Sequence, residues 1–253
     1  NGIDILDRQR GVPGGYRRAG GDLPPLPDAS VLSLAQTADG AIWAGTQQAG
    51  VQRLSPGAGQ WQGFGVAQGL PDVLVRRLLA SRDGALWAGT SIGPARWNAA
   101  TQRFDAFSAL DGRAVQSYVT ALAEDAKGRI WIGTVAGLWL YEPGATGLLG
   151  IRHEPQRVAS LVSDTVIGLL VDHQQQLWVA TGQGLDRLLG YDSRKRQADF
   201  EHVQAISAQS GLHLDELGSN LLEDRQGRIW SESFVFDPQQ KRMNVLSRSE
   251  GMD

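Results

Sequence analysis

Short apolar runs separated by turn residues fill the chain, and residues 73–109 show this pattern most plainly. Four runs, VLVRRLLAS, ALWAGT, PARWNA and RFDAFSA, are separated by the turn segments RDG, SIG and ATQ. Short apolar runs bounded by Gly, Asp and Asn are typical of successive antiparallel strands. The runs do not alternate strictly between apolar and polar residues, as strands with one wet face would. We therefore expect four-stranded antiparallel sheets that are covered on both faces.

The same phrase recurs along the chain around a tryptophan. Its copies place that residue at Trp43, Trp87, Trp131, Trp178 and Trp230. By subtraction the intervals are 44, 44, 47 and 52 residues. Ile or Leu precedes each Trp, a leucine lies nine positions before it, and a threonine follows three positions after it in four copies, with Ser233 in the fifth. Four-stranded units repeated every ~40–50 residues are the blades of a β-propeller, so we expect an all-β propeller fold.

The repeat sets the expected domain organisation. We expect a single propeller array over residues 1–253, with a partial N-terminal blade and five full blades. The expected ranges are 1–27 for the partial blade and 28–72, 73–115, 116–163, 164–214 and 215–253 for the full ones. Because each end would expose an apolar sheet face, we expect the chain to be a fragment of a larger, seven-bladed propeller region. The alternatives are that the ends meet another chain, or that a six-bladed ring is closed by overlap.

The columns of the repeat have structural interpretations. Each Trp would fill the wedge between adjacent blades, where aromatic burial contributes most. Gly40, Gly84, Gly128 and Gly227 fall at the tip of the first hairpin, where we expect a left-handed backbone. Asp39 and Asp83 would bond the turn backbone, and the Thr column would bond the main chain of a neighbouring blade. The fourth copy, DHQQQLWVAT, and the fifth, with WSES, depart from the pattern, and we expect longer or irregular hairpins there.

Composition excludes several classes of function. The formal charge is −3, and the longest basic run is Arg194–Arg196, which disfavours nucleic acid as a partner. There is no cysteine, hence no disulfide or thiolate chemistry. The chain contains neither an apolar stretch of the ~18 residues that a membrane span needs nor a signal-peptide pattern, so any membrane attachment would lie outside it.

One stretch resembles a known repeat family. The sequence EDAKGRIWIGTVAGLWLYEP, Glu124 to Pro143, together with the linker GLPD at Gly69 to Asp72, resembles the two-component regulator propeller repeat. The resemblance covers nearly the whole chain. It implies the periplasmic sensor region of a bacterial membrane-bound signalling protein, with a kinase, response-regulator or diguanylate cyclase output in the same polypeptide. It brings no catalytic residue, metal or cofactor to this chain.

Enzymatic motifs are weak. The segment GTSIG around Ser91 matches the nucleophile elbow, but that elbow requires a following helix, and a strand is expected here. The four histidines, His153, His173, His202 and His213, show no metal-ligand spacing. We expect a non-enzymatic protein without catalytic or metal-binding residues and without a cofactor.

Ligand-binding candidates follow from propeller topology. Loops that join the second strand to the third, or one blade to the next, gather at one face around the channel. The candidates at this rim are Gln47, Asp72, Arg76, Arg113, Tyr118 and Asp164, with Gln48 and Ser91 nearby. Arg could clamp a carboxylate and Tyr could stack on a sugar ring. The expected partner is a small molecule, carbohydrates included, or a protein, and a homodimer is an option.

The sensor interpretation has two alternatives. A propeller enzyme of the streptogramin-lyase type would need a channel-facing group of His and Glu, for which His173, His213 and Glu216 are the candidates. A protein-interaction scaffold would bind a protein at the same rim, with neither small-molecule sensing nor catalysis.

Overall fold

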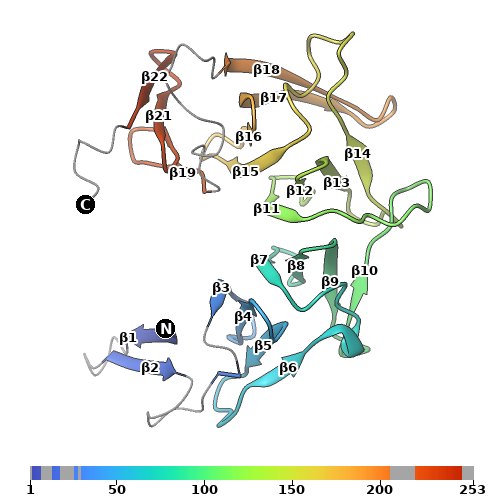
Figure 1. Ribbon diagram of the computed structural model, residues 1–253, viewed down its shortest axis with the longest axis vertical. Helices are drawn as coiled ribbons and strands as arrows, with labels where there is room; N and C mark the ends of the chain where they lie inside the picture. The colour runs from blue at the N-terminus through green and yellow to red at the C-terminus, as the bar shows by residue number, and fades with distance from the viewer. Residues whose placement is uncertain (1, 7–12, 18–25, 28–29, 206–219, 247–253) are drawn as a thin grey trace. The chain divides into compact units, whose positions relative to one another are not determined.

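The computed structural model describes residues 2–6, 13–17, 26–27, 30–205 and 220–246 (Figure 1). Within these ranges the chain is built from strands, and its helical content is the short 3-10 helix η1, Val66–Gln68. The chain forms two compact units, described in turn. The first contains residues 1–108 and 114–119, and the second contains residues 109–113 and 120–253.

The first unit contains one two-stranded and two four-stranded antiparallel sheets. The two-stranded sheet pairs β1 (Gly2–Leu6) with β2 (Pro13–Arg17). The next sheet contains β3 (Val31–Gln36), β4 (Ile42–Thr46), β5 (Val51–Leu54) and β6 (Gln62–Phe64). The third contains β7 (Val75–Ala80), β8 (Leu86–Thr90), β9 (Pro94–Asn98) and β10 (Arg103–Ala106).

The second unit contains three four-stranded antiparallel sheets, although the first residue of β11 belongs to the first unit. The first of these sheets contains β11 (Val119–Glu124), β12 (Ile130–Thr134), β13 (Gly137–Tyr141) and β14 (Leu149–Ile151). The second contains β15 (Val166–Val171), β16 (Leu177–Thr181), β17 (Gly184–Asp192) and β18 (Gln197–Ala205). The last contains β19 (Leu222–Glu223), β20 (Ile229–Trp230), β21 (Phe234–Asp237) and β22 (Arg242–Val245).

Each four-stranded sheet follows the chain order, as the meander of a propeller blade does. The second strands β8, β12 and β16 are buried along their whole length, so both of their faces are covered. The predicted all-β fold of four-stranded propeller blades is confirmed. Each of these sheets lies within one of the five repeat ranges expected from the sequence, whereas the single array and the size of the complete ring stay predictions.

The repeated tryptophans form the cores between sheets. Trp43 of β4 is 1% exposed, and its ring lies 5.3 Å from that of Trp97 in the following sheet. Trp178 of β16 lies in the same way 5.7 Å from Phe236 of β21. These contacts confirm the expected wedge role within each unit. Truncating such a side chain to Ala typically costs about 3–5 kcal/mol.

An aspartate satisfies the indole nitrogen in three copies, which the sequence analysis did not anticipate. The Nε1–H of Trp131 donates to Asp125 at 2.9 Å, and Trp178 and Trp230 have equivalent partners in Asp172 and Asp224, both at 2.8 Å. Each of these aspartates also accepts a backbone N–H of its own turn. The turn and the core tryptophan are therefore fixed by a single carboxylate.

The first hairpin has a left-handed residue three positions before each Trp. In four copies this residue is a glycine, and the φ angles of Gly40, Gly84, Gly128 and Gly227 are 80°, 83°, 72° and 76°. These turns are confirmed, as are the bonds from the backbone N–H groups of Ala41 and Ala85 to Asp39 and Asp83.

The first hairpin of the fourth copy keeps the same turn, so the prediction of a longer or irregular hairpin is wrong there. It is confirmed for the β17–β18 hairpin of the same sheet, whose strands have 9 residues each and whose register shifts between Leu185 and Asp186 and between Leu188 and Gly190. Gln175 adopts φ 64°, and its N–H donates to the Asp172 carbonyl at 2.9 Å, as the N–H of Gly128 does to Asp125. Because this bond closes the turn as it does in the glycine copies, the turn imposes its backbone conformation on a residue that adopts it only with strain.

The threonine column also differs from expectation. Thr134 Oγ1 donates to the Gly137 carbonyl at 2.8 Å, within its own hairpin, and Thr46, Thr90 and Thr181 do the same. The predicted bond to a neighbouring blade is therefore wrong for these hydroxyls. In the fifth copy the hydroxyl at the end of the second strand belongs to Ser231 and not to Ser233. The Ser231 Oγ accepts the N–H of Ser233 at 3.1 Å, and β20 is correspondingly short. A hydroxyl is needed where the second strand ends, and here the strand ends earlier.

Candidate functional site

In the first unit, three of the predicted rim residues lie near one end of the sheet β7–β10. The Ser91 hydroxyl, in the β8–β9 hairpin, donates to the Asp72 carboxylate in the connection that precedes β7. Arg76 donates to the Tyr118 hydroxyl at 3.3 Å, and its guanidinium lies 5.9 Å from the centre of that ring. Gln47 is exposed in the β4–β5 hairpin. The structure therefore joins Asp72 to Ser91 and Arg76 to Tyr118.

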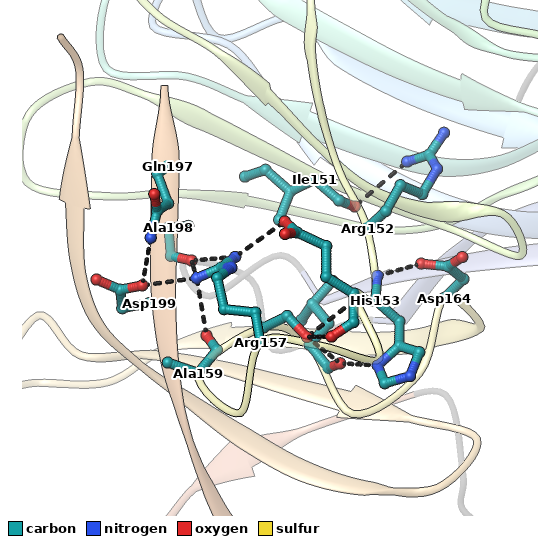
Figure 2. A network of polar contacts seen from close by, with 12 residues as sticks. Ile151, Arg152, His153, Arg157, Ala159, Asp164, Gln197, Ala198 and Asp199 are labelled. Carbon is teal, nitrogen blue, oxygen red and sulfur yellow. Dashed lines mark hydrogen bonds and ion pairs between the residues drawn. The ribbon is translucent and has the colours of Figure 1, made fainter. Parts of the chain in front are cut away.

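In the second unit, residues 152–164 of the connection between β14 and β15 are held by a dense polar network (Figure 2). Arg157 contributes most of it: its Nη1 donates to Asp199 at 2.6 Å and to the Ala198 carbonyl at 3.1 Å, both on β18. At the ends of the connection, the N–H of His153 donates to the Asp164 carboxylate at 2.6 Å. The connection is therefore closed on itself and fixed to the edge of the next sheet.

A buried carboxylate provides a second anchor for this connection. Asp186 on β17 is 0% exposed, and it accepts the N–H of Val162 at 2.9 Å. His202 on β18 contributes Nδ1 at 2.7 Å to the same carboxylate. Burial raises the pKa of Asp186, although the contacts with His202 and Val162 oppose this shift.

Arg152, the first residue of the connection, extends away from this network (Figure 2). Its guanidinium lies 4.5 Å from the ring centre of Trp139 on β13, and its Nη1 donates to the Ile151 carbonyl at 3.3 Å. Burial lowers the pKa of Arg152; the charge of Asp164 opposes this shift, and that of Arg113 adds to it. The predicted residues Asp164 and Arg113 thus both lie within electrostatic reach of Arg152.

Neither Arg152 nor Trp139 is among the residues that the sequence predicts at the rim. Trp139 is not one of the five repeated tryptophans, so the repeat assigned it no packing role between blades. The presence of an extra tryptophan outside the repeat was the only sign in the sequence of a different role. Arg113 itself is an exposed residue paired with Asp111 at 2.7 Å. The six rim candidates stay predictions.

The predicted enzymatic cluster is only partly described. His173 lies in the β15–β16 turn, at the opposite end of its sheet from the β16–β17 hairpin. Its Nδ1 contacts Glu223, and its side chain is 64% exposed. His213 and Glu216 lie outside the described residues. Over the described ranges, no group of three or more His, Asp and Glu residues could hold a metal ion, and no helix there is long and apolar enough to cross a membrane.

Comparisons with known proteins find one family model and several similar structures. Residues 25–48 and 115–136 match the model of the two component regulator propeller family. The structure is similar to the extracellular domain of a protein assigned to a hybrid two-component system of B. thetaiotaomicron, with a TM-score of 0.67, 21% identity, and coverage of 90% of this chain and 30% of that one. A second such domain from the same organism gives a TM-score of 0.58, 17% identity, and coverage of 97% and 38%.

An enzyme is also among the similar structures. A catalytically inactive virginiamycin B lyase from Staphylococcus aureus, with quinupristin, gives a TM-score of 0.66, 12% identity, and coverage of 97% of this chain and 76% of that one. At these identities the likeness shows the propeller fold. This chain spans about a third of the length of the two-component domains. No curated protein sequence matches it.

Proposed function

We propose that this chain is a ligand-sensing, non-catalytic segment of the propeller of a bacterial membrane-bound signalling receptor. The matched family segments and the similarity to two extracellular domains of two-component systems support the receptor assignment. The receptor would place this segment in the periplasm and carry a kinase, response-regulator or cyclase output elsewhere in its polypeptide.

The observation that carries the sensing role is the fixed connection 152–164. Propeller ligands are expected at the end of the sheet where the β12–β13 hairpin meets the connection that leads into β15. The Gly137 N–H, in that hairpin, donates to the Asp164 carbonyl at 2.6 Å, so the two segments do meet at one place. Since Arg157 and Asp186 hold the connection rigidly, its side chains are preorganised, which lowers the entropic cost of binding.

Signalling would follow from differential affinity. A ligand at the connection can shift an equilibrium between two packings of the blades, or of a homodimer, only if it binds one of them more tightly. We propose a small molecule as the ligand, with carbohydrates among the candidates.

A ligand screen tests the proposal. The chain is incubated with panels of carbohydrates and small carboxylates, and thermal unfolding is followed; a ligand at about 100 times its Kd adds ~2.7 kcal/mol to stability. Bound compounds are then recovered and analysed by mass spectrometry. Recovery of unchanged compound supports the sensor.

The same screen addresses the lyase alternative, which the similarity to virginiamycin B lyase favours. Steady conversion of a bound compound into a cleaved product would contradict the sensor proposal and support the enzyme. Binding of proteins but of no small molecule would support the scaffold.

A further inference from the structure

Arg152 is a half-buried cation without an ion pair among the described residues. Other arginines that lie over tryptophan rings are paired: Arg53 with Asp39 at 3.0 Å, and Arg228 with Asp224 at 2.7 Å. Removing a guanidinium from water without a counter-ion is costly. The stack on Trp139 and one carbonyl bond offset only part of that cost.

Two glycines leave the space that this arrangement occupies. A Cβ on Gly137, which has φ 111°, would lie 2.0 Å from Arg152 Nη1. A Cβ on Gly150 would lie 3.1 Å from the Trp139 ring. The absence of side chains at these two positions therefore leaves room for the guanidinium beside the indole, with its central carbon 4.5 Å from the ring centre.

The charges around Arg152 select the type of anion. Arg113 is already neutralised by Asp111 at 2.7 Å, and Asp164 adds a negative charge that acts on Arg152. With the Arg113–Asp111 pair neutral, a dianion such as sulfate or phosphate would meet a single unpaired cation and the repulsion of Asp164, which acts on a dianion more strongly than on a monoanion. A planar monoanion matches the two parallel N–H groups that one guanidinium edge presents.

We infer that Arg152 binds a carboxylate group of the ligand, so that the sensed molecule is a small carboxylic acid. Carboxylate binding at Arg152 stands apart from the proposed sensor function; only the step from a bound carboxylate to the sensed molecule rests on that function. The Trp139 ring holds the guanidinium on one side, and Asp164 disfavours dianions.

Nuclear magnetic resonance of the arginine side chains tests the site directly. In 15N-arginine protein, the Nε–H signals of Arg152 and Arg53 are assigned through the variants Arg152→Lys and Arg53→Lys. Sodium acetate is added at constant ionic strength, with acetamide as the neutral analogue and sodium sulfate as the dianion. We expect a saturable shift of the Arg152 signal with acetate alone, and no shift of Arg53, which has the same stack but a bound aspartate.

The Trp139 indole N–H signal then reports on acetate in the Arg152→Lys variant. Because Lys lacks the planar fork, acetate binding should weaken at least about tenfold. Equal shifts with acetate and acetamide, parallel shifts of Arg152 and Arg53, or tighter binding of sulfate than of acetate would overturn the inference. If acetate binds at Arg152 but does not change the output of the receptor, the sensor function alone would be contradicted.

Discussion

Replacing Gln175 by Gly should stabilise the protein, although the change removes a side chain. Gln175 has φ 64° in a turn where the other four copies have Gly. A non-glycine residue in the left-handed region costs about 1–2 kcal/mol, while Gly loses roughly 0.5–1 kcal/mol more backbone entropy on folding. Its side chain is exposed, and no hydrogen bond of it is found among the described residues. The net expectation is a gain of about 0.5–1 kcal/mol.

Thermal and urea unfolding measure this gain, and the unfolding midpoint should rise by about 2 °C in a chain of this size. Gly84→Gln is the matched control, because a Cβ at Gly84 has no atom within 4 Å and φ is 83°. It should lose a similar amount of stability through the backbone alone. If Gln175→Gly is neutral or destabilising while Gly84→Gln destabilises, the turn does not strain Gln175.

Three further predictions concern hydrogen bonds and protonation. Asp125→Ala should cost about 3 kcal/mol in urea unfolding, because it leaves the largely buried Arg129 side chain and the Trp131 indole N–H without this partner. Asp39→Ala removes a carboxylate whose side chain is 53% exposed and should cost under about 1 kcal/mol; equal losses would contradict this. Thr134→Val should cost about 1–2 kcal/mol by removing the donor to Gly137, and no loss would refute the corrected role of this hydroxyl. Burial raises the folded-state pKa of Asp186 above 3.8, so the protonated carboxyl contributes stability below that pH, and this contribution is lost as pH rises through the folded-state pKa. Asp186→Asn, which cannot ionise, should therefore gain stability relative to the native chain as pH is raised from 3.8 to neutral. Unfolding of both proteins at several pH values checks this.

Repetition made the fold predictable. A tryptophan preceded by Ile or Leu at nearly constant spacing specifies strand, core position and turn together, so blades and glycine turns followed from one observation. The same column could not reveal which acceptor the threonine hydroxyl chooses, because its own hairpin and a neighbouring blade both offer carbonyls. Nor did it show that Gln175 takes the glycine conformation, which depends on the bonds that Asp172 makes in the turn.

The candidate site was less predictable, because its members break the repeat. Asp164 and Arg113 were placed by loop position alone, and the charges of both act on the pKa of Arg152. Arg152 and Trp139 come together through the register of β13 and β14, in which Trp139 lies opposite Gly150. That register links residues whose relation is not written in any local motif.

Whether this chain is the sensing segment of a receptor is decided by the mass and full coding sequence of the native polypeptide that carries it. We expect a polypeptide that includes a membrane span and a kinase, response-regulator or cyclase region. A native polypeptide that contains this propeller and no membrane span or signalling region would contradict it.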